Sequence, residues 1–107
     1  MGDKTKFSDE AARELARNFR LLSDQTRLRI VVQLARGPLS VTALAGALSL
    51  PQHTVSHHLG ILRMGGLADS RRDGKQVIYS VRRKVLETLG RRLINHLGGN
   101  LAQQEDG

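Results

Sequence analysis

Apolar residues recur every three or four positions in five stretches of the chain, a period that predicts five amphipathic helices. The first stretch begins after Ser8, the second after Ser23 or Asp24, and the third after Ser40, and all of these side chains are good helix N-caps. Gly37-Pro38 ends the second helix, and the last helix covers 83–97. The residues expected to face inward from the second helix are Leu28, Val31, Val32 and Ala35.

The fourth helix, from Pro51 to about Met64, has two different faces. Val55, His58, Leu59 and Leu62 follow the spacing of a buried face. The opposite face, near the helix start, carries His53, Ser56 and His57 with Gly60 one turn on, and it has no carboxylate. Small polar side chains at the start of a helix can contact base edges in the major groove of DNA.

A two-stranded hairpin follows this helix. The segments 67–72 and 75–81 read as strands, and Asp73-Gly74 between them is a strong two-residue turn signal. Arg71, Arg72 and Lys75 lie at the expected tip. The predicted fold is therefore mainly α with a small β-hairpin wing, in the order α-α-α-α-β-β-α, which is the winged helix-turn-helix layout.

The length and composition of the chain indicate the number of domains and the kind of partner. The 107 residues predict a single domain, 1–107, with 1–7 and 98–107 frayed. Lys and Arg number 17 against 10 Asp and Glu, a formal charge of +7 that favours binding to nucleic acid. Aromatic residues make up only 3% of the chain, so duplex DNA is a better partner than stacked single strands.

The sequence also excludes several classes of protein. It has no cysteine, and therefore no disulfide or thiolate metal site. No apolar run has the length of a signal peptide or a membrane span, which predicts a cytoplasmic protein without membrane contact. No nucleophile motif or glycine-rich phosphate loop is present, so an enzyme is not expected.

Two segments resemble the ArsR/SmtB family of bacterial winged-helix regulators. LLSDQTRLRIVVQL is similar to the family's second helix, and TVSHHLGILRMGGLADSRRDGKQVIYSV is similar to its recognition helix and wing. The likeness covers roughly 21–81. It implies a homodimeric repressor that binds an inverted-repeat operator and is modulated by an effector. Pro51 departs from the family pattern, which often has a capping Ser at that point.

The family's metal sites are not preserved in this sequence. The third-helix segment SVTALAGAL lacks the family's Cys-x-Cys pattern. Alignment on the wing places Arg83, Val85, His96 and Gly99 at the four ligand positions of the last helix, and only His96 can bind a metal. We therefore expect no required cofactor, and at most weak binding of a divalent metal such as nickel or zinc by His96, with Glu87 or the acidic tail.

These observations lead to two functional hypotheses. The favoured one is a sequence-specific regulator of transcription, homodimeric through the first and last helices, whose effector is an unusual metal, a small molecule or a partner protein. The alternative is a general nucleoid-type or RNA-binding module without a discrete operator. His58 is expected to be structural, and Arg27 and Arg29 to add phosphate contacts. The residues expected to bind DNA are Gln52, His53, Ser56, His57, Arg63, Arg71, Arg72 and Lys75.

Overall fold

The computed structural model describes residues 7–98, which form five helices and three short strands. The expected frayed ends, 1–7 and 98–107, lie outside the described residues except for Phe7 and Gly98. The predicted order of helices and wing strands is confirmed, and one short strand is added before the third helix. The elements are α1 (Asp9–Leu22), α2 (Gln25–Leu34), β1 (Leu39–Ser40), α3 (Val41–Leu48), α4 (Gln52–Met64), β2 (Ala68–Asp73), β3 (Gln76–Val81) and α5 (Arg83–His96).

Three helices start at the side-chain caps that the sequence predicts. The backbone N–H of Ala11 donates to Oγ of Ser8 at 3.1 Å, and that of Ala43 donates to Oγ of Ser40 at 3.0 Å. For α2 the cap is Asp24, whose Oδ2 accepts from the backbone N–H of Arg27 at 3.0 Å. These bonds satisfy backbone donors that have no partner inside the helix, which fixes where each helix begins.

The core lies where α2, α3 and α4 pack together against the sheet. Its largest fully buried side chains are Ile30, Leu44, Val55, Leu59, Leu62 and Leu67. The expectation for α2 was partly wrong, because Leu28 and Val32 are 47% and 56% exposed. Ile30, Val31 and Leu34 form the buried face of α2 instead, and on a helix the positions of Leu28 and Val32 lie on the opposite side.

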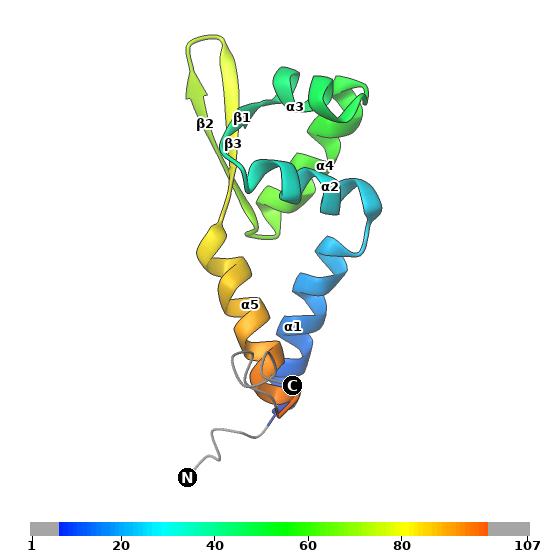
Figure 1. The fold of residues 1–107 in the computed structure, drawn as a ribbon, viewed down its shortest axis with the longest axis vertical. Coiled ribbons are helices and arrows are strands. Elements are labelled where there is room, and N and C mark those ends of the chain that lie inside the picture. Colours follow the sequence, from blue (N-terminus) through cyan, green and yellow to red (C-terminus); the bar gives the residue numbers. More distant parts are fainter. Residues whose placement is uncertain (1–6, 99–107) are drawn as a thin grey trace, which may run out of the picture.

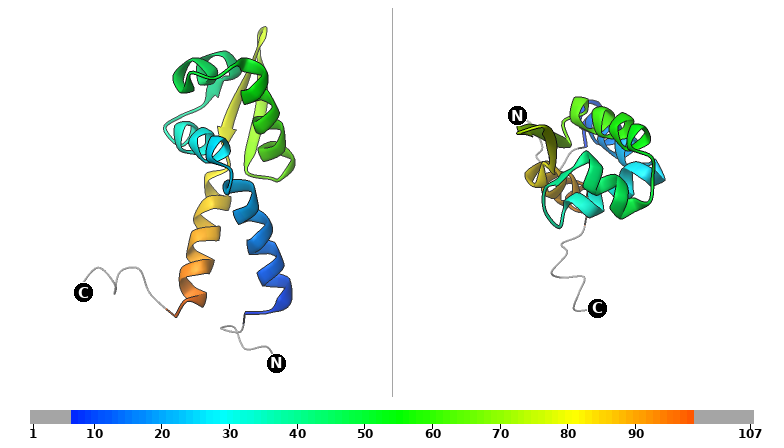
Figure 2. Two further views of the ribbon diagram at one scale, coloured as in Figure 1. Left: turned by 90° about the vertical axis from the view of Figure 1, so that its right-hand side faces the viewer. Right: turned by 90° about the horizontal axis from the view of Figure 1, so that it is seen from above.

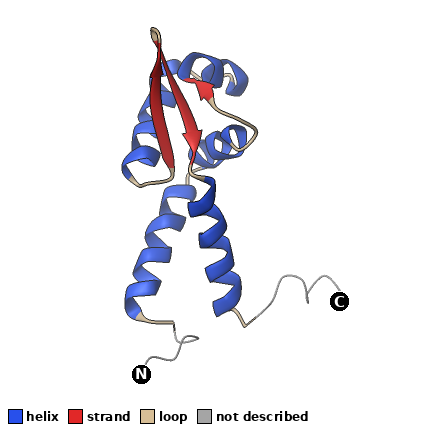
Figure 3. Ribbon diagram, turned by 90° about the vertical axis from the view of Figure 1, so that its left-hand side faces the viewer, coloured by secondary structure: helices blue, strands red, loops and turns tan. Residues whose placement is uncertain are grey.

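The sheet has three antiparallel strands in the order β1-β3-β2 (Figure 3). The sequence analysis missed β1, which pairs Leu39 with Tyr79. The hairpin turn is also displaced by one residue from the predicted Asp73-Gly74. Asp73 pairs with Gln76, so Gly74 and Lys75 form the turn, and Gly74 has a φ of 64°. A positive φ at the first of two turn residues is typical of a type II′ turn, in which glycine is preferred.

Helices α1 and α5 extend away from the core like two legs, as Figures 1 and 2 show. They contact each other, with a hydrogen-bonded ion pair between Glu14 and Arg92, and each has one buried leucine, Leu15 at 4% and Leu89 at 5% exposed. The first and last helices therefore pack against each other within one chain. Among residues 7–98, no helix is both long and apolar enough to cross a membrane.

The same leucine-to-alanine substitution at two positions of α2 tests which face of this helix is buried. Leu34 is 3% exposed, so Leu34→Ala should lower the free energy of unfolding by about 2–5 kcal/mol. Leu28→Ala removes the same atoms from an exposed position and should cost less than about 1 kcal/mol. Urea denaturation followed by circular dichroism measures both. Equal losses would show that the Leu28 side chain is covered in solution.

Candidate nucleic-acid interface

The outward face of α4 is set by the burial of its opposite face. Val55, Leu59 and Leu62 are fully buried against α2 and α3, which prevents α4 from rotating about its axis. The four residues expected at the base edges are then all exposed, and they share one polar face with no Asp or Glu anywhere in α4. These residues are Gln52, His53, Ser56 and His57.

The start of α4 differs from the starts of the other capped helices. Pro51 occupies the N-cap position with a φ of −63° and makes no side-chain hydrogen bond to the helix. The backbone N–H groups of the first turn therefore have no side-chain acceptor. Unpaired N–H groups and the positive end of the helix dipole favour an anion at this position, and DNA phosphate is such an anion. In the sequence, Pro51 is the residue that signals this arrangement.

A strained residue sets the angle between α3 and α4. Ser49 ends α3 in the left-handed conformation, with φ 56° and ψ 47°, and it is the only non-glycine residue in the described chain with a positive φ. The backbone N–H of Leu50 donates to the carbonyl of Ala45 at 3.0 Å, which closes the end of α3. The tight turn carries the chain directly into Pro51 and α4.

The basic residues of the wing point in two directions. Arg71 pairs with Ile78 and Arg72 with Val77, and consecutive residues of a strand face opposite sides of a sheet. Arg72 therefore shares a face with Val77 and, farther from the tip, with the core residue Ala68. Arg71 lies on the other face, on the same side as Asp69 and Asp73. All three predicted cations of the wing, including Lys75, are exposed, and so is Arg63 at the end of α4.

His58 belongs to a polar cluster that joins three helices, as its expected structural role requires. Its Nδ1 lies 3.3 Å from Nη1 of Arg27 and 3.8 Å from Oδ2 of Asp24. The Arg27 side chain also donates through Nε to the carbonyl of Leu21 at 2.7 Å, at the end of α1. The hydrogen bond from the Arg27 backbone N–H is the main cause that lowers the pKa of Asp24, and His58 lowers it further. This cluster ties the end of α1 to α4.

Two arginines expected at phosphate have internal partners in the structure. Arg27 is used in the cluster just described, and Nη2 of Arg29 donates to the carbonyl of Leu48 at 3.4 Å. Both guanidinium groups satisfy carbonyls at helix ends, which accounts for arginine at these positions without any contact to DNA.

The residues considered for metal binding do not come together. Glu87 and His96 both lie on α5 and are nine residues apart. This separation corresponds to about 14 Å along a helix and places the two side chains on opposite faces. One ion therefore cannot bind both residues of the same chain. The ring of His96 instead lies 4.6 Å from the ring of Phe7. Arg83 donates a hydrogen bond to the carbonyl of Ala35. Within residues 7–98 there is no group of three or more His, Asp or Glu side chains arranged to hold a metal. Gly99 and the acidic tail lie outside the described residues.

Comparison with known proteins shows that the chain is similar to bacterial regulators of transcription. The family described as "Bacterial regulatory protein, arsR family" matches residues 24–70. The Mycobacterium tuberculosis transcriptional regulator NmtR is 42% identical over 75 residues, which cover 70% of this chain and 62% of NmtR. A transcriptional repressor described as an SmtB homologue, from Synechocystis, is 39% identical over 91 residues, which cover 85% of this chain and 69% of the repressor.

A solved structure supports the same relationship. The homodimeric winged helix-turn-helix DNA-binding domain of a possible ArsR-family regulator from Mycobacterium bovis is 28% identical, with a TM-score of 0.68. The likeness covers 84% of both chains. The predicted fold class is thereby confirmed.

Proposed function

The chain belongs to the arsR family of bacterial regulatory proteins, and we propose that it is a homodimeric repressor that binds an inverted-repeat operator through α4 and the wing. Its relatives are regulators of transcription rather than enzymes. The observation that carries the proposal is the polar outward face of α4, which is exposed, free of carboxylates and held in place by buried leucines. Its place of action would be the cytoplasm, where the bacterial chromosome lies.

Selection of genomic fragments by the purified protein, followed by footprinting, tests the proposal. A discrete footprint over an inverted repeat would support an operator-binding regulator. Uniform protection of all fragments would support the alternative, a nucleoid-type protein, and preferential retention of RNA would support an RNA-binding module. The result distinguishes these classes because phosphate contacts alone carry no sequence information.

His57 is proposed to contact a base edge. Its ring is exposed on α4 and offers one donor and one acceptor when neutral. His57→Ala should weaken binding to the selected operator by about 1–3 kcal/mol and leave binding to random duplex almost unchanged. Titrations by fluorescence anisotropy on both duplexes measure this. His96→Ala, the same substitution in a leg helix, is the control and should change neither affinity. Equal losses on both duplexes would assign His57 to phosphate.

The wing is proposed to supply affinity that does not depend on sequence. Arg72→Ala should weaken all duplexes similarly and lower the magnitude of the log–log salt slope by about 1, since one phosphate contact is lost. Arg71→Ala is the matched comparison and should have a smaller effect, because Arg71 shares its face with Asp69 and Asp73. Measurement of binding at several salt concentrations gives both slopes. An unchanged slope for Arg72→Ala would show that the wing tip stays in solvent.

The dimer is proposed to form through α1 and α5. Leu93 is only partly buried and Leu97 is 71% exposed, so an apolar stripe on α5 remains available to a second copy. Light scattering at micromolar concentration should give about twice 11.8 kDa for the wild type. Leu93→Glu should shift this mass toward the monomer, because it would bury an unpaired charge. Asn95→Glu adds the same charge on the opposite, exposed side of α5 and should leave the dimer intact. A monomeric wild type would contradict the proposal.

We also infer that the effector is not zinc bound as in the family's usual sensors. The described part of one chain offers a single imidazole at the last-helix positions, so zinc or nickel should bind weakly and through His96. Calorimetry on tag-free protein should therefore give at most weak binding that is lost in His96→Ala. Nanomolar zinc affinity with release of the operator would contradict this inference.

A further inference from the structure

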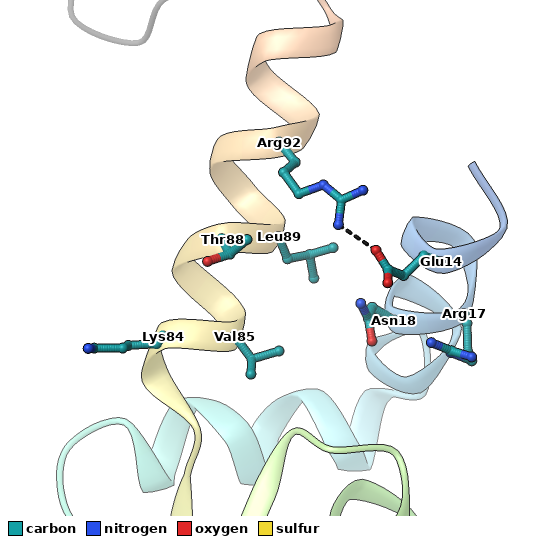
Figure 4. A pocket seen from close by; sticks show the side chains of 8 residues that line it. All are labelled: Glu14, Arg17, Asn18, Lys84, Val85, Thr88, Leu89 and Arg92. Carbon is teal, nitrogen blue, oxygen red and sulfur yellow. Dashed lines mark hydrogen bonds and ion pairs between the residues drawn. The ribbon is translucent and has the colours of Figure 1, made fainter. Parts of the chain in front are cut away.

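A cleft lies between the two leg helices, apart from the proposed DNA surface. It has a volume of about 320 Å³, which is within the range of small-molecule sites, roughly 300–1,000 Å³. Residues of α1 and of α5 line it from opposite sides, as Figure 4 shows. We call it the leg cleft and define it by Glu14, Arg17, Asn18, Val85, Leu89 and Arg92, with Lys84 and Thr88 at its edge.

The lining combines an apolar surface with charged and polar groups. The side chains of Val85 and Leu89 point from α5 toward α1, and Asn18 points from α1 toward α5 (Figure 4). Arg17 and Arg92 supply positive charge from the two helices, and the one carboxylate of the lining is that of Glu14. A small anion with an apolar body therefore matches the chemistry of the cleft.

The side chain of Glu14 shows that a carboxylate can bind to Arg92 inside the leg cleft. Its Oε1 accepts a hydrogen bond from Nη1 of Arg92. This bond is the main cause that lowers the pKa of Glu14, and Arg17 lowers it further by its charge. Both arginines therefore act on the same carboxylate. A guanidinium has five N–H donors in a fixed plane, so Arg92 retains donors for a second carboxylate.

We propose that the leg cleft binds a small organic carboxylate, with its anionic group at Arg17 and Arg92 and its apolar body against Val85 and Leu89. Asn18 is placed to donate an amide hydrogen bond to the same anion. The negative charge of Glu14 would repel a second carboxylate bound at the remaining donors of Arg92, which makes Glu14 a built-in competitor of the ligand.

The leg cleft and the proposed dimer contact use different sides of α5. Successive helix positions are about 100° apart, which places Val85, Leu89 and Arg92 roughly a quarter of a turn from the stripe of Leu86, Leu93 and Leu97. A second copy that packs on this stripe does not need the cleft positions. On α5, the ligand site and the proposed dimer contact are therefore compatible.

A ligand in this cleft would act on the spacing of the two legs. The end of α1 is joined to α4 by the hydrogen bonds from Arg27 to Leu21 and His58, so a change in the leg angle would reorient the core, and α4 with it, relative to a second copy of the chain. This part of the inference rests on the proposed function, because it makes the carboxylate the effector of DNA binding. A ligand shifts such an equilibrium only by its difference in affinity for the two arrangements.

Calorimetry without DNA tests the binding site itself. The probes are benzoate and hexanoate, each with its uncharged amide, in buffer of fixed ionic strength. Binding of at least one carboxylate, with no binding of its amide, is the expected result. No binding of either carboxylate would overturn the proposal, and so would equal binding of acid and amide.

Two variants then locate the site. Arg92→Gln should weaken carboxylate binding at least tenfold, because it removes the main donor. Glu14→Gln should strengthen binding several-fold, because it removes the internal competitor. Both variants break the same ion pair, so a general effect on the leg helices is common to both, whereas the two expected affinity changes have opposite signs. Equal losses in both variants would overturn the proposal.

A surface control and a DNA measurement complete the test. Arg71→Gln removes a charge of the same kind from the wing and should leave carboxylate binding unchanged. If it weakens binding as much as Arg92→Gln does, the anion binds the basic surface in general and the proposal is wrong. Release of the selected operator by the same carboxylate is measured separately, so a failure of the proposed DNA function is distinguishable from a failure of the ligand site.

Discussion

The packing of α4 against α2 and α3 is the constraint on which the rest of the structure depends. Val55, Leu59 and Leu62 are inaccessible to solvent, and close packing of branched side chains allows little rotation or sliding of a helix. Because one face of α4 is held in this way, the polar residues on its other face have fixed directions. A reading surface for DNA needs such fixed directions, since a hydrogen bond to a base edge depends on both distance and angle.

The same helix is joined to α1 by polar as well as apolar contacts, since Leu21 and Leu22 also pack against the core. Arg27 binds the carbonyl of Leu21 and approaches His58, so one guanidinium connects the end of α1 to α4. Hydrogen bonds to a partly exposed guanidinium contribute less stability than a buried leucine, and they depend more strongly on geometry. The joint between the core and α1 therefore combines apolar packing with hydrogen bonds, and the hydrogen bonds are the part that depends most on the direction of α1.

The sequence was sufficient for the helices and for the outward face of α4, because these depend on local signals. Helix caps such as Ser8, Asp24 and Ser40 act within three residues, and the spacing of Val55, Leu59 and Leu62 defines a buried face without knowledge of the partner helices. The strand β1 was missed because Leu39 and Ser40 form only two residue pairs, and their pairing with β3 is a contact between distant parts of the chain.

The errors have the same physical origin. Leu28 and Val32 fit an apolar spacing as well as Ile30 and Leu34 do, and only the position of α3 and α4 decides which pair is buried. Likewise, both Asp73-Gly74 and Gly74-Lys75 are acceptable turns, and pairing along the whole hairpin selects the second. The internal partners of Arg27 and Arg29 also required the structure, because a sequence gives the charge of an arginine but not its partner.

Charge alone does not decide between an operator-binding regulator and a general nucleic-acid binder, since a formal charge of +7 attracts any duplex. The distribution of the charge is more informative. The outward face of α4 carries histidine, serine and glutamine rather than a row of lysines and arginines, and the exposed arginines are mostly on the wing and the legs. A surface that served only to bind phosphate would place its cations on the helix that fits the groove. Neutral donors and acceptors at that position cost affinity for random DNA and are useful only where they match particular bases, which is the physical reason to favour a discrete operator.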